Sequence, residues 1–268
     1  MKERVLTALI LAPALLAAIL WLPASVLMVL VAAALLAGLW EWTRLIGLRQ
    51  HALQTLVLLL HAGIMAWLAW RGWPALFPFM ALLGVLWWLL ALAWLRAPDW
   101  GKVDTARNRS LKLLVGSLLV VPTWCAFALL HASGTAWVLH ALLLVWAADT
   151  FAFFAGRRFG GAKLAPAISP NKTWAGFWGG LFGVVVLALV MAPILGVELD
   201  HLLPFVLISL VAGLASVLGD LFESLIKRQA GAKDSGSLLP GHGGMLDRID
   251  SLLAALPVFA ILKDWIGL

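Results

Sequence analysis

Long apolar segments are the feature that most constrains how this chain can fold. They recur along nearly all of its 268 residues, and an α-helix needs about 20 apolar residues to cross the hydrocarbon core of a membrane. The chain is 63% hydrophobic and 12% charged, with a mean hydropathy of +1.02, whereas soluble domains are roughly 45–50% apolar and about 25% charged. The alternating pattern of a membrane β-barrel is absent. The sequence therefore predicts an all-α fold, a polytopic bundle of membrane helices.

Nine segments are predicted to be transmembrane helices: residues 5–22, 24–44, 52–70, 74–95, 111–130, 135–155, 174–196, 202–224 and 250–266. The first has the basic start and apolar core of a signal peptide. No clear small-residue cleavage site follows it, so we expect an uncleaved first span. The last segment is short and amphipathic at its start, so packing inside the bundle is the alternative for it.

The basic residues favour one orientation of these helices. With a cytoplasmic N-terminus, 17 of the 19 Lys and Arg residues fall in cytoplasmic segments, and only Arg71 and Lys263 lie on the other side. Such a bias follows the positive-inside rule. The formal net charge of +6 is then explained by topology and by anionic membrane lipid, and no nucleic-acid partner is predicted.

Residues 96–112 divide the chain into two predicted domains. The N-terminal membrane helices, residues 1–110, contain almost no charge inside their spans and are predicted to be a scaffold, whereas residues 111–268 hold all the candidate chemistry. The single cysteine, Cys125, excludes an internal disulfide and a Cys-based metal site. The chain has 16 Trp and no Tyr. The Trp residues near predicted helix ends are expected to be interfacial anchors: Trp21, Trp40, Trp42, Trp73, Trp174 and Trp265.

Charge is concentrated between Ser216 and Asp250, although long apolar runs flank this stretch. Charged residues beside a bilayer are costly and mark a functional site by default. Polar residues recur at helical spacing and line one stripe of a predicted helix: Ser216, Asp220, Glu223 or Ser224, and Lys227. A hydroxyl, a carboxylate and an ammonium on one stripe are suited to a metal–phosphate pair. For Glu223 and Lys227, the alternative is an i,i+4 salt bridge that only closes the helix.

The next segment, KDSGSLLPGHGGMLDRID, adds a tight turn and two more acids. The turn contains Gly241, His242, Gly243 and Gly244. Asp247 and Asp250 are i and i+3 on the following helix, and with Asp220 they are suited to Mg²⁺, which prefers oxygen ligands. The alternative is a helix cap with a surface ion pair. His242 is expected to position a phosphate rather than to accept a proton, because a phosphate monoester is already ionised at neutral pH.

A polyphosphate also needs positive charge, and two stretches supply it. In the charged segment the bases are Lys227, Arg228, Lys233 and Arg248. Upstream, the string GRRFGGAKLAPAISPNKT combines glycines, bases and hydroxyls just before a helix, which favours an anion site. Its candidate residues are Lys163, Ser169, Lys172 and Thr173, with Thr173 as the helix cap. The order of residues is not that of a Walker loop, and positive-inside charge plus a cap is the alternative. Asp149 is expected at the same membrane depth as Asp220 and Asp250.

These residues carry a resemblance to a known family. The string from Ser224 to Asp250, SLIKRQAGAKDSGSLLPGHGGMLDRID, resembles the signature of the phosphatidate cytidylyltransferases, also called CDP-diglyceride synthases. Residues 149–160, 168–176 and 219–224 resemble further segments of the family. The resemblance implies a nucleotidyltransferase that uses Mg²⁺ to convert CTP and phosphatidate into CDP-diacylglycerol and pyrophosphate, with K⁺ as a possible second cation. It also implies a homodimer in the bacterial inner membrane, with the active site facing the cytosol and possible dimer contacts in residues 1–110.

The resemblance also implies roles for individual residues of this chain. The metal ligands would be Asp220, Asp247 and Asp250. The catalytic residues that line the substrate pocket would be Lys227, Arg228, Lys233, Asp234, His242 and Arg248. The nucleotide would contact Ser169, Lys172 and Thr173. Further substrate-binding candidates are Asp149, Lys163, Ser216, Glu223, Ser224, Gly241, Gly243 and Gly244. The residue pattern by itself predicts only a membrane enzyme that acts on a phosphate with Mg²⁺.

Three alternatives to this function remain at the level of sequence. A sibling enzyme would attach CTP to a different lipid phosphate. A transporter of an anionic solute would place buried charge near the bilayer midplane and show related halves, whereas here the acids cluster at one edge and no repeat is visible. An inactive scaffold is the third alternative, and the presence of every signature acid and base argues against it.

Overall fold

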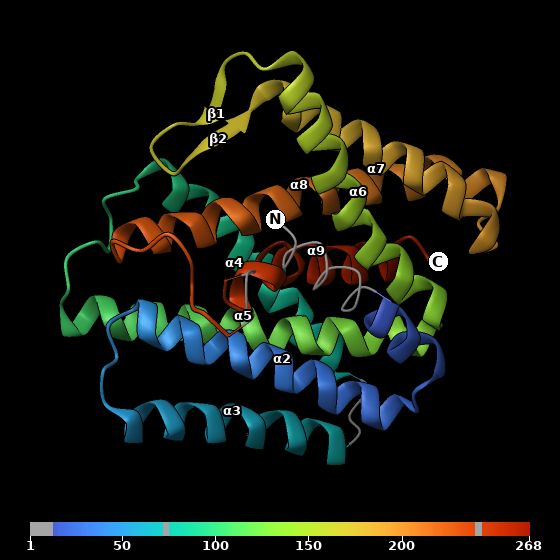
Figure 1. Ribbon diagram of the computed structural model, residues 1–268. Coiled ribbons are helices and arrows are strands. Elements are labelled where there is room, and N and C mark those ends of the chain that lie inside the picture. Colours follow the sequence, from blue (N-terminus) through green and yellow to red (C-terminus); the bar gives the residue numbers. More distant parts are fainter. Residues whose placement is uncertain (1–12, 72–74, 239–242) are drawn as a thin grey trace.

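The computed structural model describes residues 13–71, 75–238 and 243–268 (Figure 1). Residues 13–21 are helical. The helices that follow are α2 (Ala24–Leu45), α3 (His51–Arg71), α4 (Leu76–Arg96), α5 (Ala106–Ser133), α6 (Thr135–Phe159), α7 (Trp174–Ile194), α8 (Leu199–Gln229) and α9 (Leu246–Trp265). Their bounds follow the apolar segments of the sequence closely. The first predicted span, residues 5–22, lies partly outside the described residues.

Seven helices of the described chain, α2 to α8, are long and apolar enough to cross a membrane. The protein is therefore an integral membrane protein. Helix α9 is not among the seven, because charged residues occur at both of its ends. It packs instead against α2, α4, α5, α6 and α8, with Ala254, Phe259 and Ala260 fully buried, and lies at the centre of Figure 1. The predicted alternative of packing inside the bundle is thus confirmed for the last helix.

The polar connections gather at one end of the bundle. The loops between α2 and α3, between α4 and α5, and between α8 and α9 all lie at the left of Figure 1. Gln229, at the end of α8, donates hydrogen bonds from Nε2 to the carbonyl oxygens of Pro98 (2.8 Å) and Trp100 (2.9 Å). These loops hold many of the basic residues that were assigned to one side of the membrane. The compartment that they face stays a prediction.

A short hairpin, which was not predicted, interrupts the otherwise helical chain. Strands β1 (Lys163–Ala165) and β2 (Ser169–Thr173) pair antiparallel, with Lys163 opposite Thr173. Gly160 and Gly161 have φ angles of +59° and +90°, which glycine adopts without steric cost, so the chain turns out of α6 there. The predicted cap at Thr173 is confirmed, since its Oγ1 accepts a hydrogen bond from the Gly176 N–H at 3.1 Å.

Glycines hold α6 and α7 close together beneath this hairpin. A Cβ atom on Gly176 would lie 2.9 Å from the Ala152 carbonyl oxygen, and one on Gly180 would lie 2.9 Å from the Ala148 carbonyl oxygen. Small residues four positions apart let membrane helices approach at backbone distance. The hairpin therefore stands on a tightly packed helix pair.

Helix α8 is held by aromatic packing on its buried face. Phe222 is 1% exposed, and four Trp rings from α2 and α4 surround it at centroid distances between 5.5 and 6.3 Å. The four are Trp42, Trp87, Trp88 and Trp94. Aromatic pairs of this geometry add stability beyond their buried area. This cluster fixes the part of α8 that carries the neighbouring acids.

The expectation of interfacial Trp anchors is wrong for Trp42. Its side chain is 1% exposed, and its indole N–H donates to the Lys112 carbonyl oxygen at 2.8 Å. A buried indole needs such an acceptor, and α5 provides it. Trp21 and Trp265 are 80% and 82% exposed, as an anchor requires. Trp73 lies outside the described residues.

A glycine substitution tests the contact between α8 and α9. A Cβ atom on Gly219 would overlap the Asp250 carbonyl oxygen and lie 3.2 Å from the Ala254 Cβ, whereas one on Gly63 in α3 would meet nothing within 4 Å. We expect Gly219→Ala to lower the melting temperature in detergent, since overpacking costs about 1–3 kcal/mol. Gly63→Ala is the matched control and should be neutral or stabilising by about 0.5–1 kcal/mol. Equal stability of the two variants would contradict the close packing of α8 on α9.

Candidate active site

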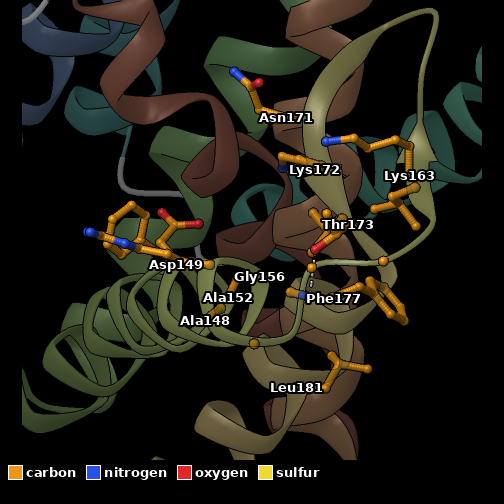
Figure 2. Close-up of a pocket in the computed structure, with 18 of the residues that line it drawn as sticks. Ala148, Asp149, Ala152, Gly156, Lys163, Asn171, Lys172, Thr173, Phe177 and Leu181 are labelled. Atoms are coloured by element: carbon orange, nitrogen blue, oxygen red, sulfur yellow. Dashed lines mark hydrogen bonds between the residues drawn. The ribbon is translucent and has the colours of Figure 1, made fainter.

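A cavity of about 710 Å³ lies between α6, α7, the hairpin and α8; we call it the hairpin cavity. Its polar lining includes Asp149, Lys163, Asn171, Lys172 and Thr173, and its apolar lining includes Phe153, Phe177, Leu181 and Val217. Figure 2 shows the polar side chains along the hairpin, and Phe177 and Leu181 on the helix that follows it. One cavity thus offers charged groups and apolar surface side by side, which suits a ligand with a charged head and an apolar body.

The hairpin is tied to α8 by an ion pair. Lys172 Nζ lies 2.6 Å from Asp220 Oδ2, and the two side chains are 27% and 28% exposed. Asp220 Oδ1 also accepts a hydrogen bond from the Ser224 hydroxyl at 3.3 Å. Helical spacing along α8 could not reveal this pair, because Lys172 belongs to β2. The structure thus brings together residues 168–176 and 219–224, two of the three further segments that resemble the family.

Three predicted acids gather beside this ion pair. Asp149 on α6, Asp220 on α8 and Asp250 on α9 lie close enough to repel one another electrostatically. Asp250 Oδ1 accepts a hydrogen bond from the Ser251 N–H at 2.6 Å. Because three acids from three helices converge, this place needs a positive partner beyond Lys172 when all three are ionised.

Lys227 links α8 to α9. Its ammonium forms ion pairs with Glu223, one turn earlier on α8, and with Asp247 Oδ1 of α9 at 2.7 Å. The predicted i,i+4 salt bridge is therefore confirmed, but the same lysine also crosses to the next helix. The Glu223 side chain is 3% exposed, and its Oε1 has no hydrogen-bond partner among the described residues.

Asp247 collects hydrogen bonds at the start of α9. It accepts from the backbone N–H of Gly244 at 2.8 Å and of Ser235 at 3.0 Å, in addition to Lys227. Burial alone would raise the pKa of Asp247, but these hydrogen bonds hold that pKa below its ordinary value. Asp247 is therefore an anion at neutral pH. The predicted alternative, a helix cap with a surface ion pair, is wrong, since no side chain caps the first residue of α9 and the Asp247 side chain is only 7% exposed.

The carboxylate of Glu41 holds the same loop from the other side. Glu41 is fully buried on α2. It accepts hydrogen bonds from the Ser235 hydroxyl (2.9 Å) and from the backbone N–H groups of Met245 (3.0 Å) and Leu246 (2.8 Å). Sequence analysis missed it, because the groups that Glu41 binds lie 194 to 205 residues away in the sequence. The rarity of a carboxylate inside an apolar run was the signal that could have found it.

The remaining candidates take different places. Arg228 Nε donates to the Ile168 carbonyl oxygen at 3.3 Å, which ties the end of α8 to the hairpin. The Ser216 hydroxyl bonds within its own helix, to the Gly213 carbonyl oxygen at 2.8 Å. Arg248 is near enough to Asp149 to attract it. The following candidates are exposed or half-buried: Lys233, Asp234, Ser169 and Gly243. Gly241 and His242 lie outside the described residues.

The predicted metal ligands do not form one compact group. In residues 13–71, 75–238 and 243–268, no three His, Cys, Asp or Glu side chains lie together as a metal ion would require. Asp220 and Asp247 each contact a lysine ammonium, Lys172 and Lys227 respectively. The donor chemistry still fits a hard cation, because carboxylates converge here from α6, α8 and α9.

Comparison with known proteins finds similar sequences along most of this chain. A sequence model of the cytidylyltransferase family matches residues 2–265. The phosphatidate cytidylyltransferase of Pseudomonas aeruginosa is 39% identical over 271 residues, which cover 98% of this chain and 96% of the relative. That of Haemophilus influenzae is 37% identical over 281 residues, covering 97% of both chains. That of Brucella abortus is 36% identical over 247 residues, covering 82% of this chain and 77% of the relative.

Replacing Glu41 tests whether α2 holds the loop before α9. In Glu41→Gln an NH₂ group replaces one carboxylate oxygen. This group is a donor and faces the O–H and N–H donors of the loop, so one or two of the three hydrogen bonds are lost. We expect amide hydrogen exchange over residues 235–248 to accelerate by about tenfold or more, since each lost buried bond costs about 1–3 kcal/mol.

Glu198→Gln is the control, because Glu198 is exposed at the other end of the bundle and makes no side-chain cap. It should leave exchange in this loop unchanged. Unaltered exchange in Glu41→Gln would show that the loop is held by other contacts.

Proposed function

The chain belongs to the cytidylyltransferase family, and from this premise we propose that it transfers a cytidylyl group from CTP to phosphatidate. It is a nucleotidyltransferase enzyme, and the relatives named above are phosphatidate cytidylyltransferases. The products would be CDP-diacylglycerol and pyrophosphate, which makes the reaction a step of phospholipid synthesis.

The observation that best supports this function is the composition of the hairpin cavity. Phosphatidate has a phosphate head and two acyl chains, and the cavity combines Lys163 and Lys172 with the apolar side chains of Phe177 and Leu181. Because seven helices place this protein in a membrane, a lipid substrate can reach the cavity from the bilayer.

The reaction needs positioning and charge neutralisation more than covalent catalysis by the protein. A phosphate oxygen of phosphatidate would attack the α-phosphorus of CTP, forming a new P–O bond. The bond between the α-phosphorus and the oxygen bridging to the β-phosphate would break, and pyrophosphate would leave with that electron pair. Lys172, Lys227 and Arg228 would neutralise the phosphates, while Thr173 and the hairpin backbone would orient the nucleotide.

We further propose Mg²⁺ as the cofactor, held by Asp220, Asp247 and Asp250 and shared with the substrate phosphates. When bound, it would supply Lewis-acid polarisation and charge neutralisation at the transferring phosphorus. Asp220 and Asp247 already form ion pairs with Lys172 and Lys227, so both carboxylates lie where a positive charge is favourable. A second cation such as K⁺ would neutralise an acid that Mg²⁺ leaves unpaired, and Asp149 is the candidate because it interacts electrostatically with Asp220 and Asp250.

The site would face the cytosol from a bacterial inner membrane, and the protein would be a homodimer. The orientation is supported by the distribution of Lys and Arg between the loops and by the gathering of the polar loops at one end of the bundle. A cytosolic site would receive CTP from water and phosphatidate from the membrane. The dimer is proposed from the family resemblance alone.

The direct test uses purified protein in detergent with phosphatidate, Mg²⁺ and each labelled nucleoside triphosphate in turn. We expect lipid-soluble label with CTP and its loss on addition of EDTA. Other lipid phosphates, supplied in place of phosphatidate, would define the acceptor range. No product from any nucleotide, in protein shown to be folded, would refute the proposed function.

Substituting two acids tests the proposed metal ligands. We expect Asp220→Asn and Asp247→Asn each to lower turnover by on the order of 100-fold or more, because an amide removes charge that the transition state requires. Both variants should remain folded in the membrane fraction, since Asn has the shape of Asp.

Asp200→Asn is the matched control, because Asp200 is exposed in the first turn of α8, far along the helix from Asp220. Arg71→Ala should be equally silent. Near-normal turnover of either Asp220→Asn or Asp247→Asn would remove that residue from the metal site.

A further inference from the structure

A second cavity, of about 600 Å³, shares no lining residue with the hairpin cavity. Its walls come from the end of α2, the loop before α5, the start of α5, the end of α8 and residues 232–237. We call it the basic cavity. It lies at the polar end of the bundle and uses the N-terminal helices, which the proposed function leaves without a ligand.

The charges that line the basic cavity are unbalanced. Five are basic and two are acidic: Arg44, Arg49, Lys102, Arg109 and Lys112 against Asp104 and Asp234. Arg109 pairs with Asp104 at 2.8 Å, and Lys102 pairs with Asp99 at 3.2 Å. No ion pair of Arg44, Arg49 or Lys112 is found in the part of the chain that the structure describes, although Asp104 attracts Lys112 from beyond ion-pair distance. The cavity therefore presents positive charge that an anion would neutralise.

Lys112 is the strongest indication of a ligand. It lies in the first two turns of α5 and is only 8% exposed, and its ammonium makes no hydrogen bond or ion pair with any described residue. Its carbonyl oxygen is engaged by Trp42, and its side chain runs beside Gly101. Asp104 attracts Lys112 but is already paired with Arg109, and a basic side chain inside a membrane protein marks a ligand pathway by default. Here the missing partner would be an anion in the cavity.

The lining also indicates what kind of anion would fit. Asn108, Gln229, Ser235 and Ser237 add polar groups to the wall, whereas the hairpin cavity has aromatic and aliphatic side chains beside its bases. A lipid would leave its acyl chains against this polar wall. Several bases that converge on one polar cavity suit a water-soluble ligand with more than one phosphate.

We propose that the basic cavity is a second polyphosphate site, which binds pyrophosphate or the triphosphate of a nucleotide separately from the hairpin cavity. The choice of this ligand class rests on the proposed function, which consumes a triphosphate and releases pyrophosphate. A ligand here lies against Ser235, whose N–H donates to Asp247 and whose hydroxyl donates to Glu41. Occupancy of the basic cavity therefore acts on the loop that positions Asp247.

The test is equilibrium dialysis of labelled pyrophosphate against purified protein in detergent, without CTP or lipid substrate. A Lys172→Met background weakens anion binding in the hairpin cavity and isolates the second site. In that background we expect saturable binding that Lys112→Met weakens by roughly tenfold or more. Lys112→Arg should stay within about threefold of the background, because it keeps the charge.

Arg107→Met is the matched control, since Arg107 is an exposed base near the start of α5, as Lys112 is near that start, and does not line the cavity. It should change binding by less than about twofold, because exposed charges in high dielectric interact weakly. Pyrophosphate binding that is equal in Lys112→Met and Arg107→Met would overturn the proposal.

Nanodiscs separate a lipid headgroup from a soluble ligand. If phosphatidylglycerol stays bound to the wild type and not to Lys112→Met, while pyrophosphate does not bind at all, the cavity holds a lipid headgroup and the polyphosphate assignment is overturned.

The binding assay involves no turnover, so it is independent of the transfer reaction. Cytidylyl transfer by a protein that lacks the second binding event would overturn this proposal alone, and binding without transfer would overturn the proposed function alone.

Discussion

Charge buried in an apolar bundle must find partners, and the rest of this structure depends on how the chain meets that requirement. The clearest case is Glu41, whose carboxylate is fully buried. It accepts three hydrogen bonds, two from the loop before α9 and one from the first residue of α9. That loop in turn gives two backbone N–H groups to Asp247, which holds Lys227 of α8. A chain of contacts thus runs from α2 to α8. Removing one of these side chains would leave the next polar group buried without a partner, which costs free energy in an apolar interior.

Two ion pairs of the candidate site join elements that are separate in sequence. Lys172 of β2 meets Asp220 of α8, and Lys227 of α8 meets Asp247 of α9. The acids of the candidate site therefore do not stand on one rigid helix. Their relative positions depend on how the hairpin, α8 and α9 pack, and the aromatic rings around Phe222 and the glycines of α7 fix that packing. The N-terminal helices belong to this arrangement, because Glu41 and the rings of α2 and α4 contribute to it.

Sequence predicted what depends on local periodicity. The apolar runs placed the spanning helices, the spacing of Glu223 and Lys227 predicted their salt bridge, and the position of Thr173 predicted a helix cap. It could not predict pairings between separate elements, because no rule of spacing connects Lys172 with Asp220 or Glu41 with Leu246. The hairpin was missed for a related reason, since strands of three and five residues are too short to show alternation.

The place of α9 has a consequence for how the protein is made. This helix follows the other described helices in sequence but lies at the centre of the bundle, and its charges make it a poor substrate for insertion into lipid on its own. It can enter only once α2, α4, α5 and α8 offer it an interior. During synthesis the apolar helices α2 to α8 therefore come before α9, which carries Asp247 and Asp250. The proposed metal ligands on α9 would then be the last part of the candidate site to reach their places.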